Sequence, residues 1–101
     1  MKFKDKVVII TGASRGIGRN LALGLAQEGC HVVVAAKTVT DTPELPGTIH
    51  SVAAEVEALG RQALPFQVDL RDGEAIEAMV QATLDRFGRV DFLINNAGAL
   101  F

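Results

Sequence analysis

The stretch TGASRGIG, residues 11–18, constrains the fold of this chain more than any other feature. It holds three glycines within seven residues, between an apolar run at 6–11 and a segment with helical spacing at 17–28. Glycine allows tight turns and a close approach of other backbone, because it carries no Cβ atom. The stretch therefore predicts a turn that leads a buried strand directly into a helix.

The same alternation of strand-like and helix-like segments runs through the whole chain. Strands are expected over 6–11, 31–37, 63–70 and 90–98, and helices over 17–28, 49–59 and 73–87, with Thr48 and Asp72 as N-caps. Near-continuous apolar strands joined through helices indicate a parallel sheet that is covered on both faces. The sequence thus predicts an α/β fold, a Rossmann-type doubly wound parallel sheet represented by its first β-α-β-α-β-α-β half.

Composition places the chain among globular proteins and excludes several classes of partner. Its 101 residues are read as one domain, 1–101, with 49% apolar residues and a formal net charge of −2. This balance gives no electrostatic basis for binding nucleic acid or an anionic membrane, and no apolar run reaches the roughly 18 residues of a membrane span. Without a signal-peptide pattern, the expected location is the cytoplasm. One cysteine and two unclustered histidines predict no metal site.

The glycine turn has the geometry of an anion site. A helix that starts at the carboxyl edge of a parallel sheet presents backbone N–H groups and the positive end of its dipole, which suit a pyrophosphate. We expect Gly12 to permit the tight turn, Gly16 to admit the phosphate and Gly18 to let the helix pack closely. The alternative is a glycine-rich turn without a ligand, because the spacing G-x-x-x-G-x-G is weak evidence by itself.

The end of the second expected strand bears on which dinucleotide binds. NAD sites of this kind usually hold the ribose 2′-hydroxyl with an acidic residue there, about 20 residues past the glycines. This chain has Ala35, Ala36 and Lys37 instead. Lys37 would attract a 2′-phosphate, with Arg15 as a second cation and Ser14 as a hydrogen-bond donor. The pattern favours NADP over NAD, the alternative being that Lys37 and Arg15 are solvated surface charges.

Three motifs resemble those of the short-chain dehydrogenase/reductase family: TGASRGIG at 11–18, VDL at 68–70 and INNAG at 94–98. The resemblance covers the whole chain and implies cofactor contacts from the ends of three strands. The implied set is Gly12, Ser14, Arg15, Gly16, Ile17 and Gly18 in the loop, Asp69 and Leu70 near the adenine, and Asn95, Ala97 and Gly98 beside the ribose. The resemblance also implies that the last three of these residues steady the central strands. Asp69 could instead satisfy backbone N–H groups, and Asn95 and Asn96 could be turn residues only.

Within the family, AAKT at 35–38 and PELPGTIHSVAAEVEALG at 43–60 resemble the hydroxysteroid dehydrogenase-like subgroup. The resemblance implies hydride transfer between a nicotinamide and a small carbonyl or alcohol substrate, with a Tyr and a Lys four residues after it as catalytic groups. The chain contains no Tyr, so we assign it no catalytic residue. The family also implies a homo-oligomer when complete and the strand order 3-2-1-4, which leaves VDFLI at 90–94 as an apolar edge. Pro65 by itself predicts an edge position for the strand over 63–70.

Two functions from different classes stay open at this point. The first is the N-terminal, NADP-binding half of a short-chain oxidoreductase, as a piece of a longer enzyme. The second is a stand-alone or split nucleotide-binding or interaction module that performs no catalysis. A longer gene would favour the first, and a monodisperse chain of this length in solution would favour the second. A third alternative is a half-protein completed by a partner chain that carries the Tyr and the Lys.

Overall fold

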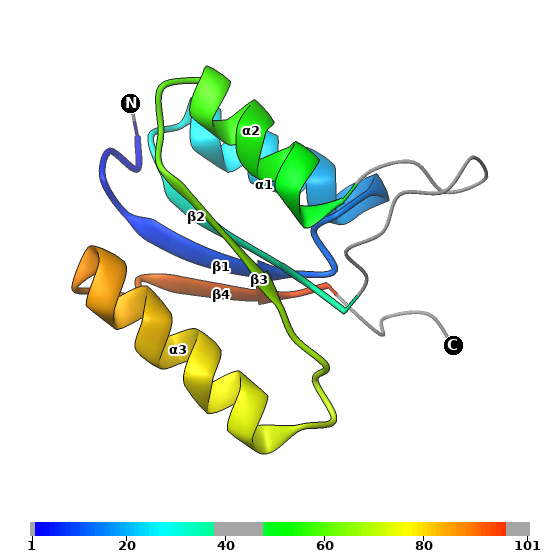
Figure 1. Ribbon diagram of the computed structural model, residues 1–101. Coiled ribbons are helices and arrows are strands. Elements are labelled where there is room, and N and C mark those ends of the chain that lie inside the picture. The colour runs from blue at the N-terminus through cyan, green and yellow to red at the C-terminus, as the bar shows by residue number, and fades with distance from the viewer. Residues whose placement is uncertain (1, 38–47, 97–101) are drawn as a thin grey trace.

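The computed structural model describes residues 2–37 and 48–96, along which strands and helices alternate (Figure 1). The elements are β1 (Val7–Thr11), α1 (Gly16–Gln27), β2 (His31–Ala36), α2 (Ile49–Ala58), β3 (Ala63–Gln67), α3 (Gly73–Phe87) and β4 (Phe92–Asn95). This is the predicted order. The expectation for 63–70 was too long, because Val68 is buried beyond the last residue of β3 and extends the apolar run past the strand.

The four strands form one parallel sheet in the order β3-β2-β1-β4. β1 is central, because Ile10 pairs with Val34 of β2 on one side and with Ile94 of β4 on the other. Pro65 lies in β3, at one edge of the sheet. Both the expected strand order and the edge position of Pro65 are confirmed. Since all strands run the same way, their carboxyl ends meet at one edge of the sheet.

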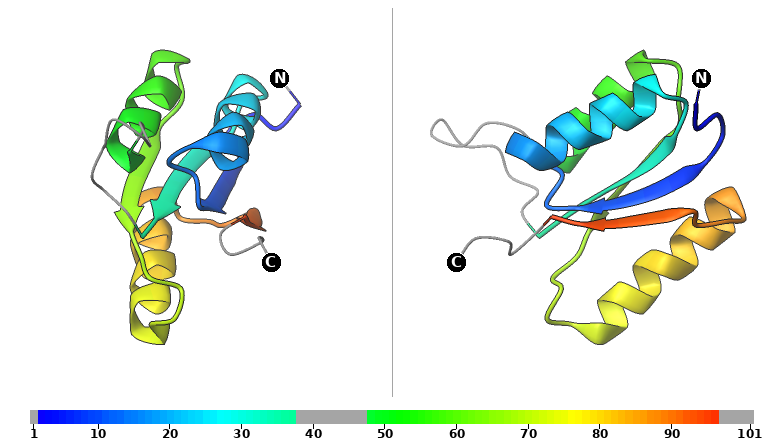
Figure 2. Two further views of the ribbon diagram at one scale, coloured as in Figure 1. Left: turned by 90° about the vertical axis from the view of Figure 1, so that its right-hand side faces the viewer. Right: turned by 180° about the vertical axis from the view of Figure 1, so that it is seen from behind.

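Helices cover both faces of this sheet. α1 and α2 lie on one face and α3 lies on the other (Figure 2). The residues of β1 alternate accordingly: Val8 and Ile10 belong to the core beneath α1 and α2, whereas Ile9 packs with Val33 and Met79 on the α3 side. Apolar side chains on both faces account for the near-continuous apolar strands. The doubly wound architecture is therefore confirmed.

Side chains cap the N-termini of α2 and α3 but not that of α1. Thr48 Oγ1 accepts a hydrogen bond from Ser51 N at 3.0 Å, and Ser51 Oγ accepts one from Thr48 N at 2.9 Å, which makes a capping box. Asp72 Oδ1 accepts from two backbone N–H groups in the first turn of α3. Both predicted caps are confirmed. Arg15, at the N-cap of α1, makes no side-chain capping bond, so the N–H groups there are left open at the carboxyl edge of the sheet.

β4 gives the sheet an apolar edge. Among the described residues it pairs only with β1, and Leu93 is 64% exposed. Val80 and Leu84 of α3, which is alone on its face of the described sheet, are exposed as well. The expected edge strand is thus confirmed for this part of the chain. Such edges pair readily with other β-structure.

Asp91 joins the starts of β1 and β4. Its Oδ2 accepts a hydrogen bond from Val7 N at 2.8 Å, and its own N–H donates to Val7 O at 2.9 Å. Arg89 donates to both carboxylate oxygens, each at 2.8 Å. The hydrogen bonds from Arg89, and then the bond from Val7, lower the pKa of Asp91 below its ordinary value of 3.8.

Acid should therefore weaken the fold through Asp91. Because its pKa is lower in the folded state, the stabilisation is complete above the ordinary carboxyl pKa and is lost as the pH falls through the folded-state value. We expect the free energy of unfolding in urea to fall between about pH 5 and about pH 2. Asp91→Asn should lose part of this dependence, whereas Asp85→Asn, on the exposed side of α3, should keep it. An unchanged pH dependence in Asp91→Asn would contradict this role.

Candidate cofactor site

The turn between β1 and α1 requires its glycines for different reasons. Gly12 and Gly16 have φ values of 65° and 60°, in the left-handed region that side chains rarely adopt. Gly18 is needed for space: a Cβ atom there would lie 2.1 Å from Gly12 O and 2.8 Å from Asn96 Nδ2. The predicted roles of Gly12 in the turn and of Gly18 in close packing agree with this geometry.

The outer side of the turn is open. A Cβ atom added to Gly16 would have no heavy atom within 4 Å, and Gly16 itself is exposed. Ile17 is 70% exposed, an unusual state for a large apolar side chain, whereas Ser14 is buried. No acidic residue lies in the first turn of α1. The N-terminus of α1 therefore offers backbone N–H groups, free space and no repelling charge to an anion.

Hydrogen bonds join the turn to the carboxyl end of β4. Thr11 Oγ1 donates to Asn95 Oδ1 at 3.0 Å and accepts from Asn96 N at 3.0 Å. Asn96 Nδ2 donates to Gly12 O at 3.2 Å. The two asparagines of the INNAG motif thus hold the ends of β1 and β4 together. A structural role for Asn95 is therefore present in addition to any contact with a ligand.

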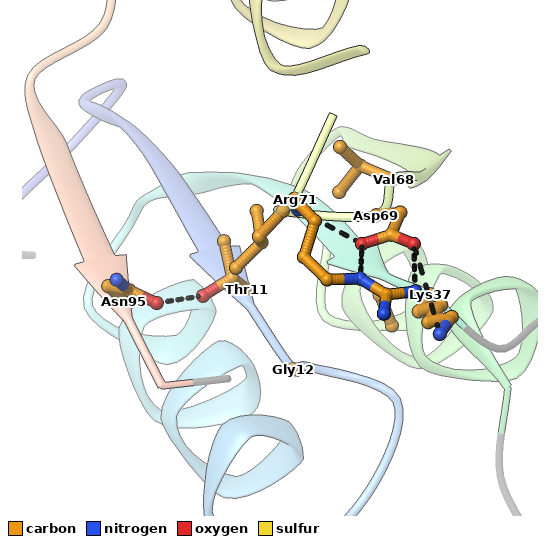
Figure 3. A pocket seen from close by; sticks show the side chains of 9 residues that line it. Thr11, Gly12, Lys37, Val68, Asp69, Arg71 and Asn95 are labelled. Carbon is orange, nitrogen blue, oxygen red and sulfur yellow. Dashed lines mark hydrogen bonds and ion pairs between the residues drawn. The ribbon is translucent and has the colours of Figure 1, made fainter. Parts of the chain in front are cut away.

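A pocket of about 440 Å³ lies at this carboxyl edge (Figure 3). It is lined by Thr11, Gly12, Ala36, Lys37, Val68, Asp69, Leu70, Arg71 and Asn95. The structure thus brings together Gly12, Lys37, Asp69, Leu70 and Asn95 from the predicted set. Ser14, Arg15, Gly16, Ile17 and Gly18 lie on the adjoining turn and the start of α1 and do not line the pocket. Ala97 and Gly98 lie outside the described residues.

Three charged side chains meet at the rim of the pocket (Figure 3). Asp69 Oδ2 accepts a hydrogen bond from Arg71 Nη2 at 2.8 Å and lies 3.8 Å from Lys37 Nζ. Asp69 Oδ1 accepts from Arg71 Nε at 3.1 Å and from Arg71 N at 3.0 Å. These hydrogen bonds from Arg71, with the charge of Lys37 adding to them, hold the pKa of Asp69 well below its ordinary range. Asp69 is therefore an anion neutralised by two cations.

Sequence reasoning missed Arg71. Arg71 directly follows the VDL motif and lines the pocket, but the predicted set did not include it. The role of Arg15 as a second cation beside Lys37 stays a prediction. The available signal was a basic residue two positions after an acid at the end of a strand. That spacing allows a local ion pair in many loops. The pair lies beside Lys37 because β3 pairs with β2, which places the loop after β3 next to the end of β2.

Neither a metal site nor a reactive thiol finds support in the described residues. No group of three or more His, Cys, Asp or Glu side chains in residues 2–37 and 48–96 has an arrangement that could hold a metal ion. Cys30 is fully buried, and its burial raises the pKa of the thiol, so it behaves as a packing residue.

None of the helices in this part of the chain has the length and apolar character needed to cross a bilayer.

A parallel sheet with helices on both faces, a glycine turn after its central strand and a pocket at its carboxyl edge define a Rossmann-type fold. The family model described as short chain dehydrogenase matches residues 6–100. The chain therefore belongs to the short-chain dehydrogenase family, as its three motifs predict.

Individual relatives refine this placement. Hydroxysteroid dehydrogenase-like protein 2 of Danio rerio is 53% identical over 99 residues, which are 98% of this chain and 24% of the relative. This similarity confirms the predicted subgroup. A short chain dehydrogenase of Mycobacterium thermoresistibile is 43% identical with a TM-score of 0.91, covering 98% of this chain and 35% of that one. Carveol dehydrogenase of Mycobacterium avium, solved in complex with NAD, is 34% identical with a TM-score of 0.84. The match covers 96% of this chain and 37% of that one.

The matched region is only part of these proteins. The chain spans about a quarter of the length of the curated relatives and about a third of the solved structures that it matches. The shared part is the sheet with its glycine turn, and the similarity therefore supports the cofactor end of the site more directly than the place where a substrate reacts.

Proposed function

We propose that this chain is the NADP-binding part of an oxidoreductase that transfers a hydride between a nicotinamide and a carbonyl or alcohol substrate. Membership of the short-chain dehydrogenase family supports the reaction class. The complex of the similar carveol dehydrogenase with NAD supports a nicotinamide dinucleotide as the ligand. The observation that carries the proposal is that Gly12 of the turn and Lys37 at the end of β2 line one pocket beside the open N-terminus of α1.

The described residues fit the adenosine end of a dinucleotide. The open space over Gly16 admits a phosphate close to the backbone. The adjoining pocket of about 440 Å³ has the size of a small-molecule site. Val68 and Leu70 contribute apolar walls, and Asn95 contributes a polar group. This combination suits a planar base attached to a hydroxylated sugar.

Each part of the site has its own role in this proposal. The backbone N–H groups of residues 16–18 bind the pyrophosphate at the positive end of the α1 dipole. Val68 and Leu70 enclose the base, and Lys37 binds the phosphate on the ribose. The bound dinucleotide supplies the hydride-transfer chemistry. Because the chain contains no Tyr, a proton donor of the family type has to come from outside these 101 residues.

Charge at the end of β2 supports NADP rather than NAD. Lys37 stands where an acidic residue would accept a hydrogen bond from the ribose 2′-hydroxyl, and its side chain is 66% exposed and within reach of solvent ions. Asp69, the nearby acid, is neutralised by Arg71 and Lys37 and so repels a phosphate only weakly. Parallel calorimetric titrations with NADP and NAD test the proposal. Tighter binding of NADP supports it, tighter binding of NAD overturns the preference, and binding of neither by folded protein overturns the assignment of the site.

Lys37→Asp should reverse the cofactor preference. The aspartate removes a partner of the 2′-phosphate, repels that phosphate and offers an acceptor to a 2′-hydroxyl. We expect NADP to bind about tenfold more weakly or worse, and NAD to bind at least as well as before. The measurement is the ratio of the two dissociation constants by calorimetry. Lys4→Asp makes the same charge change in the exposed segment before β1 and should leave the ratio unchanged. An unchanged NADP preference in Lys37→Asp would refute the role of Lys37.

A further inference from the structure

Three hydrogen bonds from Arg71 and the charge of Lys37, whose Nζ is 3.8 Å from Oδ2, surround the carboxylate of Asp69. Each of its oxygens already has two cationic or amide partners, three of which are groups of Arg71. The side chain thus holds a guanidinium and an ammonium at the rim of the pocket while cancelling only one of their two positive charges. The three groups together carry one net positive charge.

We propose that Arg71 is a specificity-determining residue of this site: Arg71 and Lys37 jointly bind a phosphate on the adenosine ribose, and Asp69 positions both cations. This inference rests on the proposed function, because it concerns the same pocket and the same cofactor. It differs in assigning the second cation to Arg71 on the loop after β3, rather than to Arg15 in the glycine turn.

The geometry of Arg71 suits this role. Its side chain is 80% exposed, and only Nε and Nη2 donate to Asp69, so Nη1 has no partner among the described residues. A guanidinium fork can bind two phosphate oxygens at once, which the point charge of Lys37 cannot do. Nη1 can therefore donate to a phosphate oxygen while Nε and Nη2 keep their hydrogen bonds to Asp69, so Asp69 continues to position the guanidinium.

Arg15 lacks the corresponding placement. It is the N-cap residue of α1 and does not line the pocket that contains Lys37. Arg71 and Lys37, in contrast, approach the same oxygen of Asp69 from different elements, at 2.8 Å and 3.8 Å. An anion that binds one of these cations at the rim therefore lies within the field of the other.

A second ion pair in the chain provides a matched control. Arg89 donates to both oxygens of Asp91, with the same separation of two positions along the chain as in the Asp69–Arg71 pair. Asp91 also binds Val7 N at the amino end of the sheet, and Arg89 does not line the candidate pocket. Arg89→Gln thus removes an equivalent charge and ion pair without touching the site.

The test compares two ligands that differ only in the ribose phosphate, adenosine 2′,5′-bisphosphate and adenosine 5′-monophosphate, and repeats the comparison with NADP and NAD. Arg71→Gln should weaken the binding of the 2′-phosphorylated ligands about tenfold and change the others less than about twofold. Arg71→Lys should retain part of the difference, because it keeps the charge and loses the fork. Arg89→Gln should leave all four dissociation constants unchanged.

The outcomes separate this inference from the function on which it rests. If the unaltered protein prefers NADP and Arg71→Gln keeps that preference, Arg71 is not a specificity residue, and the proposed function stands. An equal loss for phosphorylated and unphosphorylated ligands would also overturn the inference, because it would indicate a general effect on the pocket. If the unaltered protein binds none of the four ligands, both proposals fail. Circular dichroism spectra of the variants ensure that each comparison is made on folded protein.

Discussion

Gly18→Ala is expected to lose dinucleotide binding and to destabilise the protein by about 3 kcal/mol, because the added methyl group meets backbone rather than a mobile side chain. Its position would be 2.1 Å from Gly12 O and 2.8 Å from Asn96 Nδ2. Relief of that contact requires α1 to move away from the turn or the turn to move away from β4. Either shift displaces the N–H groups proposed to bind the pyrophosphate.

Gly24→Ala is the matched control for this change. Gly24 lies on the exposed side of the same helix, and a Cβ atom there would have no heavy atom within 4 Å. Alanine has the higher helix propensity, so this variant should gain about 0.5 to 1 kcal/mol and bind dinucleotide normally. The two variants are compared by urea unfolding and by calorimetric titration. Near-normal stability and binding in Gly18→Ala would show that the turn is less tightly packed than the structure has it.

The order of the strands and helices was predictable from the sequence, because the residues that mark the edges of the sheet and the ends of the helices act through strong physical causes. Pro65 has no backbone N–H to donate to a neighbouring strand, so it indicates a strand at the edge of the sheet. β3 is at an edge. Asp72 and Gly88 mark the ends of α3 by chemistry specific to helix termini. The ends of strands are less predictable. Val68 is buried and its N–H still donates to Ala36 O of β2 at 3.0 Å, although β3 itself ends at Gln67, so the apolar run extends one residue or more past the strand.

The site was predictable where it depends on the backbone and unpredictable where it depends on long side chains. Gly12 and Gly18 are dictated by a turn that the sequence already implies. The meeting of Lys37 with Arg71 depends instead on how the end of β2 and the loop after β3 lie relative to each other. A flexible lysine or arginine can reach several partners from one position, so the pattern of residues alone does not predict that Arg71 lies beside Lys37.

Thr11→Val should cost about 2 kcal/mol although valine has nearly the shape of threonine. Thr11 is buried, and its hydroxyl donates to Asn95 Oδ1 and accepts from Asn96 N, each at 3.0 Å. Valine fills the space but leaves the N–H of Asn96 without this acceptor, and it removes one of the links between the glycine turn and the end of β4. We expect weaker dinucleotide binding together with the loss of stability, since the turn is held partly through that link.

Thr83→Val separates this effect from the general replacement of a buried hydroxyl. Thr83 is fully buried in α3, and its hydroxyl donates to Met79 O, one turn back in the same helix, at 2.8 Å. Met79 O is also in position to accept the backbone hydrogen bond of the helix. Loss of the Thr83 hydroxyl should therefore change the free energy of unfolding by no more than about 0.5 kcal/mol. Urea unfolding of both variants gives the comparison. Equal costs would contradict a special role for the Thr11 hydroxyl, and the bond from Asn96 Nδ2 to Gly12 O and the pairing of β1 with β4 would then account for the hold of the turn on β4.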